Sequence, residues 1–390
     1  MFFLYERINK IVEELSNYIY TEKVRIEDFL IQEGHFKSIE EAEKKNNWMP
    51  FGKEDWWGGR DKNYWFKTEF VISEKFHDKE MALIVYTNSN GWDAVNPQFI
   101  AYINGRPVQG IDVNHREVIL EERYKKGEKI RIDLHAYSGL INAKLKLFVE
   151  LAIFNRDVYE LYFDILVPLK VVQLMPEEDL TKHRIINILN KSINLLDLRK
   201  PLSENFFKSC KDAKEFLKKE LYEKVSSFED IVVWCIGHTH IDVAWHWRVA
   251  QARQKAARSF LTALKLMNEY PEFIFISSQP QLYKFVKEDY PEIYQMIKQK
   301  VTSGQWEAEG GMWLEPDCNL TSGESLIRQI IFGKRFFKEE FGVDSKVLWL
   351  PDVFGYNAAL PQILKKSGID YFMTTKISWN QFNKFPYDTF

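Results

Sequence analysis

The stretch that decides the fold is IVVWCIGHTHIDVAWHWR, residues 231–248, in which an apolar run leads directly into a group of histidines. Three of the chain's eight histidines fall within nine positions here, and Asp242 stands between two of them. The apolar run predicts a buried strand. Because reactive groups in parallel β/α folds gather where strands end, this stretch predicts a functional site at the end of that strand.

Apolar runs and helical stretches alternate along the chain after residue 230. The runs lie at 231–237, 273–277, 305–309, 347–350 and 371–375, and the helical stretches lie near 249–269, 281–302, 323–341 and 358–367. Strict alternation of strand and helix predicts a parallel sheet with right-handed crossovers. Polar side chains follow every run, which is not expected of a purely structural sheet.

A different pattern precedes residue 230. Residues 2–20 carry a helical stripe of apolar side chains, and from about residue 64 short β-branched or aromatic runs recur at regular spacing. Asn104-Gly105 lies between two of these runs and predicts a hairpin turn. The pattern predicts an all-β sandwich that runs to about residue 175. We therefore expect a multidomain chain with an N-terminal helix plus β-sandwich domain over 1–176, a helical connector over 177–226 and a parallel β/α domain over 227–390.

The composition is that of an ordinary globular protein. Lys+Arg 53 against Asp+Glu 56 gives a net charge of -3, which favours neither nucleic acid nor an anionic membrane as a partner. The three cysteines, Cys210, Cys235 and Cys318, are odd in number and far apart, so they fit neither a disulfide framework nor a cysteine-based zinc site. The N-terminus lacks the apolar core of a signal peptide, and no apolar stretch reaches the roughly 18 residues of a membrane span. We expect a cytoplasmic protein.

Three residues that follow two of the predicted strands point to a metal. His240 and Asp242 are two residues apart just past a strand, so both side chains can turn toward one point. Imidazole nitrogen and carboxylate oxygen suit zinc. Asp352 follows the fourth run, where a carboxylate is poorly hydrated unless a cation lies beside it. Strand-end hydrogen bonds for the histidines and an N-cap role for Asp352 are the alternatives. No histidine follows His246, so any further imidazole ligand lies outside this sequence.

Two further groups are weaker candidates. Glu315 and Asp317 lie in a loop, where acidic side chains are usually solvated. Trp56, Trp57 and Trp65 could form a platform for a sugar ring, although packing beneath the sandwich is favoured for such large apolar side chains.

Four blocks of sequence resemble the class II α-mannosidases, glycoside hydrolase family 38. They are HTHIDVAW (238–245), EGGMWLEPDCNLTSGESLIRQIIFGKRFF (309–337), LPDVFGYNAALPQIL (350–364) and TTKISWNQFNKFPYDTF (374–390). The earlier block AYINGRPVQGIDVNHREV (101–118) resembles the N-terminal domain of the branch that carries a β-sandwich. The resemblance implies that 227–390 is the first part of a β/α-barrel catalytic domain. The chain ends inside a motif of the family, whose members are more than twice as long, so we expect it to be an N-terminal portion.

The resemblance also implies roles for individual residues. His240, Asp242 and Asp352 would bind one Zn²⁺, with Co²⁺ or another divalent transition metal as an alternative, and Asp352 would also be the nucleophile. The remaining residues would contact the sugar: Trp245 by stacking, Phe354 and Asp317 by lining the pocket, and Lys376 as a basic contact. The family's further zinc histidine and its general acid would lie beyond this chain.

The implied activity is hydrolysis of terminal α-linked mannose from oligosaccharides, through a covalent glycosyl-enzyme on Asp352. The implied partner is a mannose-containing oligosaccharide, with neither nucleic acid nor membrane, and homo-oligomerisation of the full-length protein is left open. HTHID alone also fits metal-dependent amidohydrolases, which need more histidines after later strands. A third hypothesis is that these 390 residues bind metal or sugar without turnover, and we expect the isolated portion to be inactive.

Overall fold

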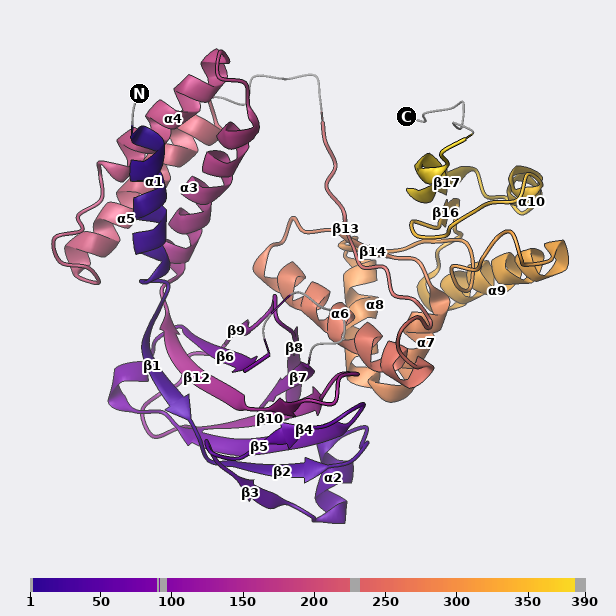
Figure 1. The fold of residues 1–390 in the computed structure, drawn as a ribbon, viewed down its shortest axis with the longest axis horizontal. Helices are drawn as coiled ribbons and strands as arrows, with labels where there is room; N and C mark the ends of the chain where they lie inside the picture. Colours follow the sequence, from indigo (N-terminus) through magenta and orange to yellow (C-terminus); the bar gives the residue numbers. More distant parts are fainter. Residues whose placement is uncertain (1–2, 90, 92–96, 225–231, 383–390) are drawn as a thin grey trace.

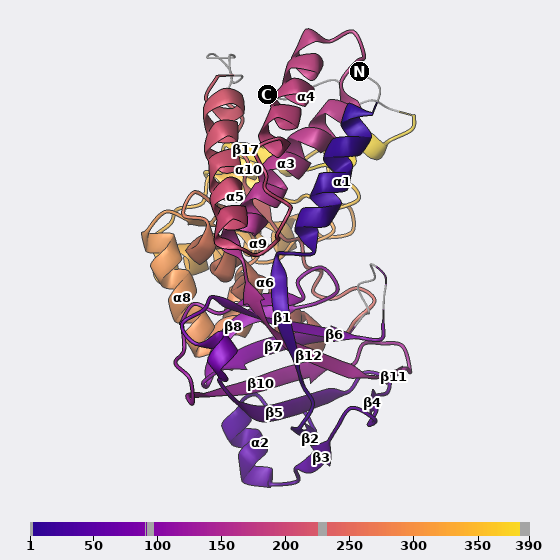
Figure 2. The ribbon, with the colours of Figure 1, turned by 90° about the vertical axis from the view of Figure 1, so that its left-hand side faces the viewer.

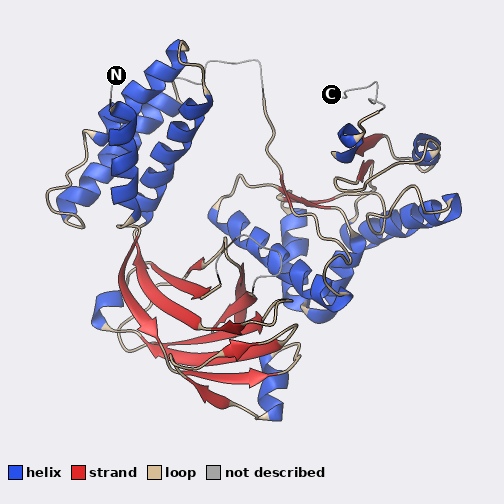
Figure 3. Ribbon diagram, in the orientation of Figure 1, coloured by secondary structure: helices blue, strands red, loops and turns tan. Residues whose placement is uncertain are grey.

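The computed structural model describes residues 3–89, 91, 97–224 and 232–382. The chain forms a helical part, a β-sandwich and a mixed α/β part, each with its own buried apolar side chains (Figures 1 and 3). None of the helices in these ranges is both long enough and apolar enough to span a lipid bilayer.

The sandwich consists of two antiparallel sheets. One has the strand order β1-β12-β6-β9 and the other β3-β2-β5-β10-β7-β8, and a separate two-residue pair joins β4 to β11. The strands are β1 (Tyr20–Ile26), β2 (Phe29–Glu33), β3 (Met49–Phe51), β4 (Trp57–Gly58), β5 (Asn63–Val71), β6 (Met81–Thr87), β7 (Gln98–Ile103), β8 (Arg106–Ile111), β9 (Glu117–Ile119), β10 (Lys129–Tyr137), β11 (Lys144–Leu145) and β12 (Leu147–Phe154). A short helix, α2 (Ile39–Lys45), lies between β2 and β3. The predicted sandwich is therefore present.

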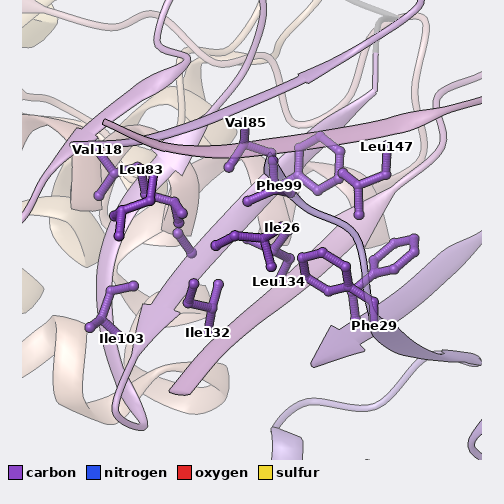
Figure 4. Close-up of a cluster of buried hydrophobic side chains, with 14 of the residues drawn as sticks. Ile26, Phe29, Leu83, Val85, Phe99, Ile103, Val118, Ile132, Leu134 and Leu147 are labelled. Carbon is purple, nitrogen blue, oxygen red and sulfur yellow. The ribbon is translucent and has the colours of Figure 1, made fainter. Parts of the chain in front are cut away.

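The alternation of side chains along β10 shows that both faces of its sheet are buried. Ile132 and Leu134 point into the core between the two sheets (Figure 4), and Ile130 belongs to the same core. Asp133 and His135 belong to the opposite face and are also buried: His135 lies beside Arg253 and Gln254 of the α/β part, and Asp133 forms an ion pair with Arg131. The turn at Asn104-Gly105 has φ of 51° and 79°, which confirms the predicted hairpin between β7 and β8.

The sandwich ends at Phe154 and does not run to residue 175. A helix, α3 (Arg156–Leu174), follows β12 directly. Its buried residues Val158, Leu161, Ile165 and Leu169 recur every three or four positions. This helical period is obscured in the sequence by the β-branched residues around them and by a proline within the helix.

The helices expected to be a connector form a bundle with the N-terminal helix. The members are α1 (Leu4–Ser16), α3, α4 (Leu180–Ile193) and α5 (Glu204–Leu217), followed by a short π-helical turn at Lys218–Tyr222. Their apolar faces share one core, in which Ile8 and Leu15 of α1 pack with side chains of the other three helices. Figure 2 shows this bundle beside the sandwich, with β1 and β12 leading into it.

The α/β part contains two short parallel sheets. β13 (Gly237–His238), β14 (Phe275–Ser277) and β15 (Trp306–Ala308) form one, and β16 (Val347–Trp349) and β17 (Tyr371–Met373) form the other. The helices are α6 (Val249–Glu269), α7 (Pro280–Asp289), α8 (Pro291–Thr302), α9 (Gly323–Phe341) and α10 (Leu360–Lys366). The parallel β/α pattern is confirmed, whereas the expected barrel is not: in the described ranges the two sheets are separate.

The first predicted strand of this part is much shorter than expected. Residues 232–236 are not in a strand, and Val233 and Trp234 are 76% and 77% exposed. β13 is an edge strand whose only neighbour within the described residues is β14. The prediction of a buried strand at 231–237 was therefore wrong for residues 232–236, and of the described residues in this run Gly237 alone lies in a strand.

The sandwich and the α/β part meet through α6, which lies on β8. Thr262 Oγ1 donates to the Gly110 carbonyl at 3.2 Å, and Gln254 Nε2 donates to Asn63 Oδ1 at 2.9 Å. A Cβ on Gly110 would lie 2.5 Å from the Arg258 carbonyl oxygen, so only glycine allows this approach. Trp65 is fully buried in the same interface, as expected for a packing side chain.

Candidate active site

The side chains of His240, Asp242 and Asp352 lie together although they come from the ends of different strands. His240 and Asp242 follow β13, and Asp352 follows β16. His240 Nε2 is 3.2 Å from Asp242 Oδ1 and 3.7 Å from Asp352 Oδ2. The convergence expected at the carboxyl ends of parallel strands is therefore present at this point.

The other ring nitrogen of His240 faces a buried carboxylate. Nδ1 lies 2.9 Å from Glu315 Oε2, and the Glu315 side chain is only 4% exposed. Ser278 Oγ donates to Glu315 Oε1 at 3.0 Å and holds the carboxylate from its other side. Apart from their mutual contact, the two facing atoms have no hydrogen-bond partner in the described part of the chain. Glu315 thus fixes the imidazole with Nε2 directed at the two aspartates.

The carboxylates around His240 determine its protonation in the metal-free protein. Burial lowers the pKa of His240, but the hydrogen bond with Asp242 and the contact with Glu315 outweigh burial and raise the pKa to about 10. The imidazole is then protonated at neutral pH. A metal ion at Nε2 would have to displace this proton.

His238 has a different, structural role. Its Nδ1 lies 3.0 Å from the Ile276 carbonyl oxygen, and Trp349 Nε1 donates to its Nε2 at 3.3 Å. Both ring nitrogens are occupied, and burial lowers the pKa of His238. The neutral ring therefore ties β13 to β14 and β16, and neither nitrogen is free to bind a metal.

Lys376 reaches the same site from a short 3₁₀ helix, Lys376–Trp379, which follows β17. Its Nζ lies 2.5 Å from Asp352 Oδ1 and 3.5 Å from the centre of the Trp379 ring. The exposed ring of Phe354 lies 5.1 Å from the same Nζ. One oxygen of Asp352 therefore faces Lys376 and the other faces His240.

Two of the predicted site residues do not contact this cluster. Trp245 is 63% exposed, and together with Asp61 and Arg248 it lines a surface pocket beside the sandwich. The Asp317 carboxylate accepts hydrogen bonds from the Asn319 and Leu320 amides, at 2.8 Å each, and so caps a turn. The structure brings together His240, Asp242, Asp352 and Lys376, with Phe354 beside them.

The chemical types of the donor atoms in this cluster suit zinc. One imidazole and two carboxylates are typical zinc ligands. Within the ranges that the structure describes, however, no group of three or more His, Cys, Asp or Glu side chains is already arranged to hold a metal ion. The atoms of the cluster instead satisfy one another through the hydrogen bond and ion pairs given above.

Comparison with known protein families indicates the same family as the sequence blocks that carry this site. Residues 230–390 match the N-terminal domain of glycosyl hydrolases family 38. This match confirms the resemblance to family 38 found in the sequence of this part of the chain. The match favours the resemblance to family 38 over the amidohydrolase alternative.

Several named α-mannosidases are similar to the chain over most of its length. Alpha-mannosidase G of Dictyostelium discoideum is 36% identical over 84% of the chain and 31% of its own length. Alpha-mannosidase 2C1 of Homo sapiens is 33% identical over 86% of the chain and 32% of its own length. Alpha-mannosidase of Saccharomyces cerevisiae is 39% identical over 60% of the chain and 22% of its own length. The chain thus spans about a third, or less, of these relatives.

Proposed function

We propose that the full-length protein is a retaining α-mannosidase that removes terminal α-linked mannose from oligosaccharides. The observation that supports this most is the meeting of Asp352, Asp242 and His240 at strand ends of a family 38 domain. The similar proteins named above are α-mannosidases, and the chain covers only part of them. The activity is therefore proposed for the whole protein, and a cytoplasmic location is proposed with it.

In this proposal Asp352 is the nucleophile. Its carboxylate oxygen forms a bond to the anomeric carbon of mannose while the glycosidic C–O bond breaks. The departing oxygen takes a proton from a general acid, for which we assign no residue of this chain. A water molecule then attacks the same carbon, the ester bond to Asp352 breaks, and the sugar leaves with its original configuration. Lys376, paired with Asp352 Oδ1, orients the carboxylate and contacts the substrate.

His240, Asp242 and Asp352 would hold a zinc ion. When bound, zinc would supply positive charge to which the 2- and 3-hydroxyls of mannose bind. Glu315 and Ser278 keep the His240 ring oriented toward the two aspartates, and oriented ligands bind metal more tightly than loose ones. Phe354, exposed beside Lys376, offers an apolar face for the sugar ring, whereas Trp245 lines another surface pocket.

The configuration of the first product tests the proposal. The full-length protein is given an aryl α-mannoside, and the first anomer released is recorded by NMR. We expect α-mannose, because two displacements at one carbon restore the configuration. Release of β-mannose would exclude Asp352 as a nucleophile, and no release would reject the activity.

A further inference from the structure

Trp379 is an exposed tryptophan at the edge of the candidate site. The residue is 64% exposed, and it lines a cavity of about 770 Å³ together with Phe354 and Lys376. Single exposed apolar side chains are common and need no explanation by themselves. This ring, however, lies 3.5 Å from the charged end of Lys376, measured from the ring centre to Nζ. The role of Trp379 therefore depends on that of Lys376.

A short 3₁₀ helix, Lys376–Trp379, places these two side chains on one face. Side chains three positions apart in a 3₁₀ helix lie one above the other, and Lys376 and Trp379 are its first and last residues. Thr375 joins this helix to the end of β16, because its Oγ1 donates to the Pro351 carbonyl at 2.7 Å. Pro351 directly precedes Asp352 in the chain. The helix is thus held next to the proposed nucleophile.

The ammonium group of Lys376 lies between a carboxylate and an indole ring. Its Nζ is 2.5 Å from Asp352 Oδ1 on one side and close to the centre of the Trp379 ring on the other, the arrangement of a cation–π contact. The Asp352 side chain remains 35% exposed, and an ion pair open to water holds a flexible lysine only weakly. The Lys376 side chain is only 12% exposed. The indole therefore adds a second attraction for the ammonium group and helps to cover it from water.

We propose that Trp379 is a positioning residue, whose ring holds the Lys376 ammonium group against Asp352. The inference rests on the proposed function, in which Asp352 is the nucleophile. While Lys376 occupies Oδ1, the carboxylate keeps Oδ2 directed toward His240. Without the indole ring, the ammonium group would leave Asp352 for water more often, and the carboxylate could turn. Trp379 acts on the reaction through Lys376 and needs no contact with the sugar.

A double-mutant cycle in the full-length protein separates this role from direct contact with the sugar. The measured quantity is kcat/KM for an aryl α-mannoside. We expect Trp379→Leu to lower kcat/KM about 3- to 30-fold, the range of a cation–π contact, and Trp379→Phe to recover most of the loss because it keeps an aromatic face. In a Lys376→Met background, Trp379→Leu should have no further effect. An equal loss in both backgrounds, or no loss in the wild type, would overturn the proposal.

Chemical labelling of Lys376 tests the same contact without turnover. The full-length protein is treated with an amine-reactive reagent, and the rate of Lys376 modification is followed by mass spectrometry. Trp379→Leu should raise this rate by a similar factor, since the same contact is lost. Trp56→Leu is the matched control and should leave it unchanged, because the exposed Trp56 ring lies beside Lys146 on the sandwich. Absence of hydrolysis by the wild type would reject the proposed function, whereas hydrolysis with unchanged labelling in Trp379→Leu would reject only the role of Trp379.

Discussion

The orientation of one imidazole ring determines what the candidate site can bind. His240 Nδ1 faces Glu315, which leaves Nε2 for Asp242 and Asp352. The sequence predicted His240, Asp242 and Asp352 because each follows a strand. Glu315 was only a weaker candidate for the site, since acidic side chains in loops are usually solvated. Its carboxylate accepts a hydrogen bond from Ser278, which comes from the end of another strand.

Replacing Glu315 should weaken metal binding although Glu315 is not a proposed ligand. Glu315→Gln keeps the size of the side chain but removes the negative charge at Nδ1. We expect zinc affinity of the full-length protein to fall by about 10- to 100-fold, measured by titration with zinc. Asp317→Asn is the matched control, because the Asp317 carboxylate caps a turn away from His240. Equal losses in both variants would contradict the role of Glu315.

The pKa of His240 predicts how stability of the metal-free protein depends on pH. Because the folded pKa, about 10, exceeds the ordinary value of 6.5, protonation of His240 stabilises the fold fully below pH 6.5. This contribution is lost as the pH rises through about 10. The free energy of unfolding of the wild type minus that of His240→Gln, measured in denaturant from pH 6 to pH 10, should therefore decrease. A difference that is constant or grows with pH would contradict this account.

At the level of helices and strands, local pattern predicted most of the fold. The helices α6 and α9 have the predicted bounds, and the turn at Asn104-Gly105 is present. The elements that differ depend on distant contacts. α3 is helical because its apolar stripe packs in the bundle, and β13 is short and, among the described strands, pairs with β14 alone. Neither contact is visible in the sequence around the element.

Substitution of Gly110 tests the contact between β8 and α6. Gly110→Ala would place a methyl group 2.5 Å from the Arg258 carbonyl oxygen, so the helix or the strand must move. We expect a loss of about 1–3 kcal/mol in the free energy of unfolding, measured in urea. Gly323→Ala is the control, because a Cβ at Gly323 meets no atom within 4 Å. A loss in Gly323→Ala as large as that in Gly110→Ala would mean that the packing argument fails.

For the whole molecule, the proposed chemistry needs more than the residues described here. The donors His240, Asp242 and Asp352 satisfy one another, and the chain spans only about a third of two α-mannosidases to which it is similar. We therefore expect the isolated 390-residue chain to bind zinc weakly and to show no turnover of an aryl α-mannoside. Isothermal titration and a release assay measure the two properties. Tight stoichiometric binding together with turnover would show that this chain alone suffices.

The central claim, that Asp352 carries the sugar during the reaction, can be tested most directly by trapping the intermediate. A fluorinated mannosyl fluoride reacts quickly in the first step and slowly in the second, so the glycosyl-enzyme accumulates. The full-length protein is treated with this reagent, digested with protease and analysed by mass spectrometry. We predict one sugar adduct, on the peptide that contains Asp352, and none in Asp352→Ala. An adduct on another carboxylate, or persistence of the adduct in Asp352→Ala, would contradict the account.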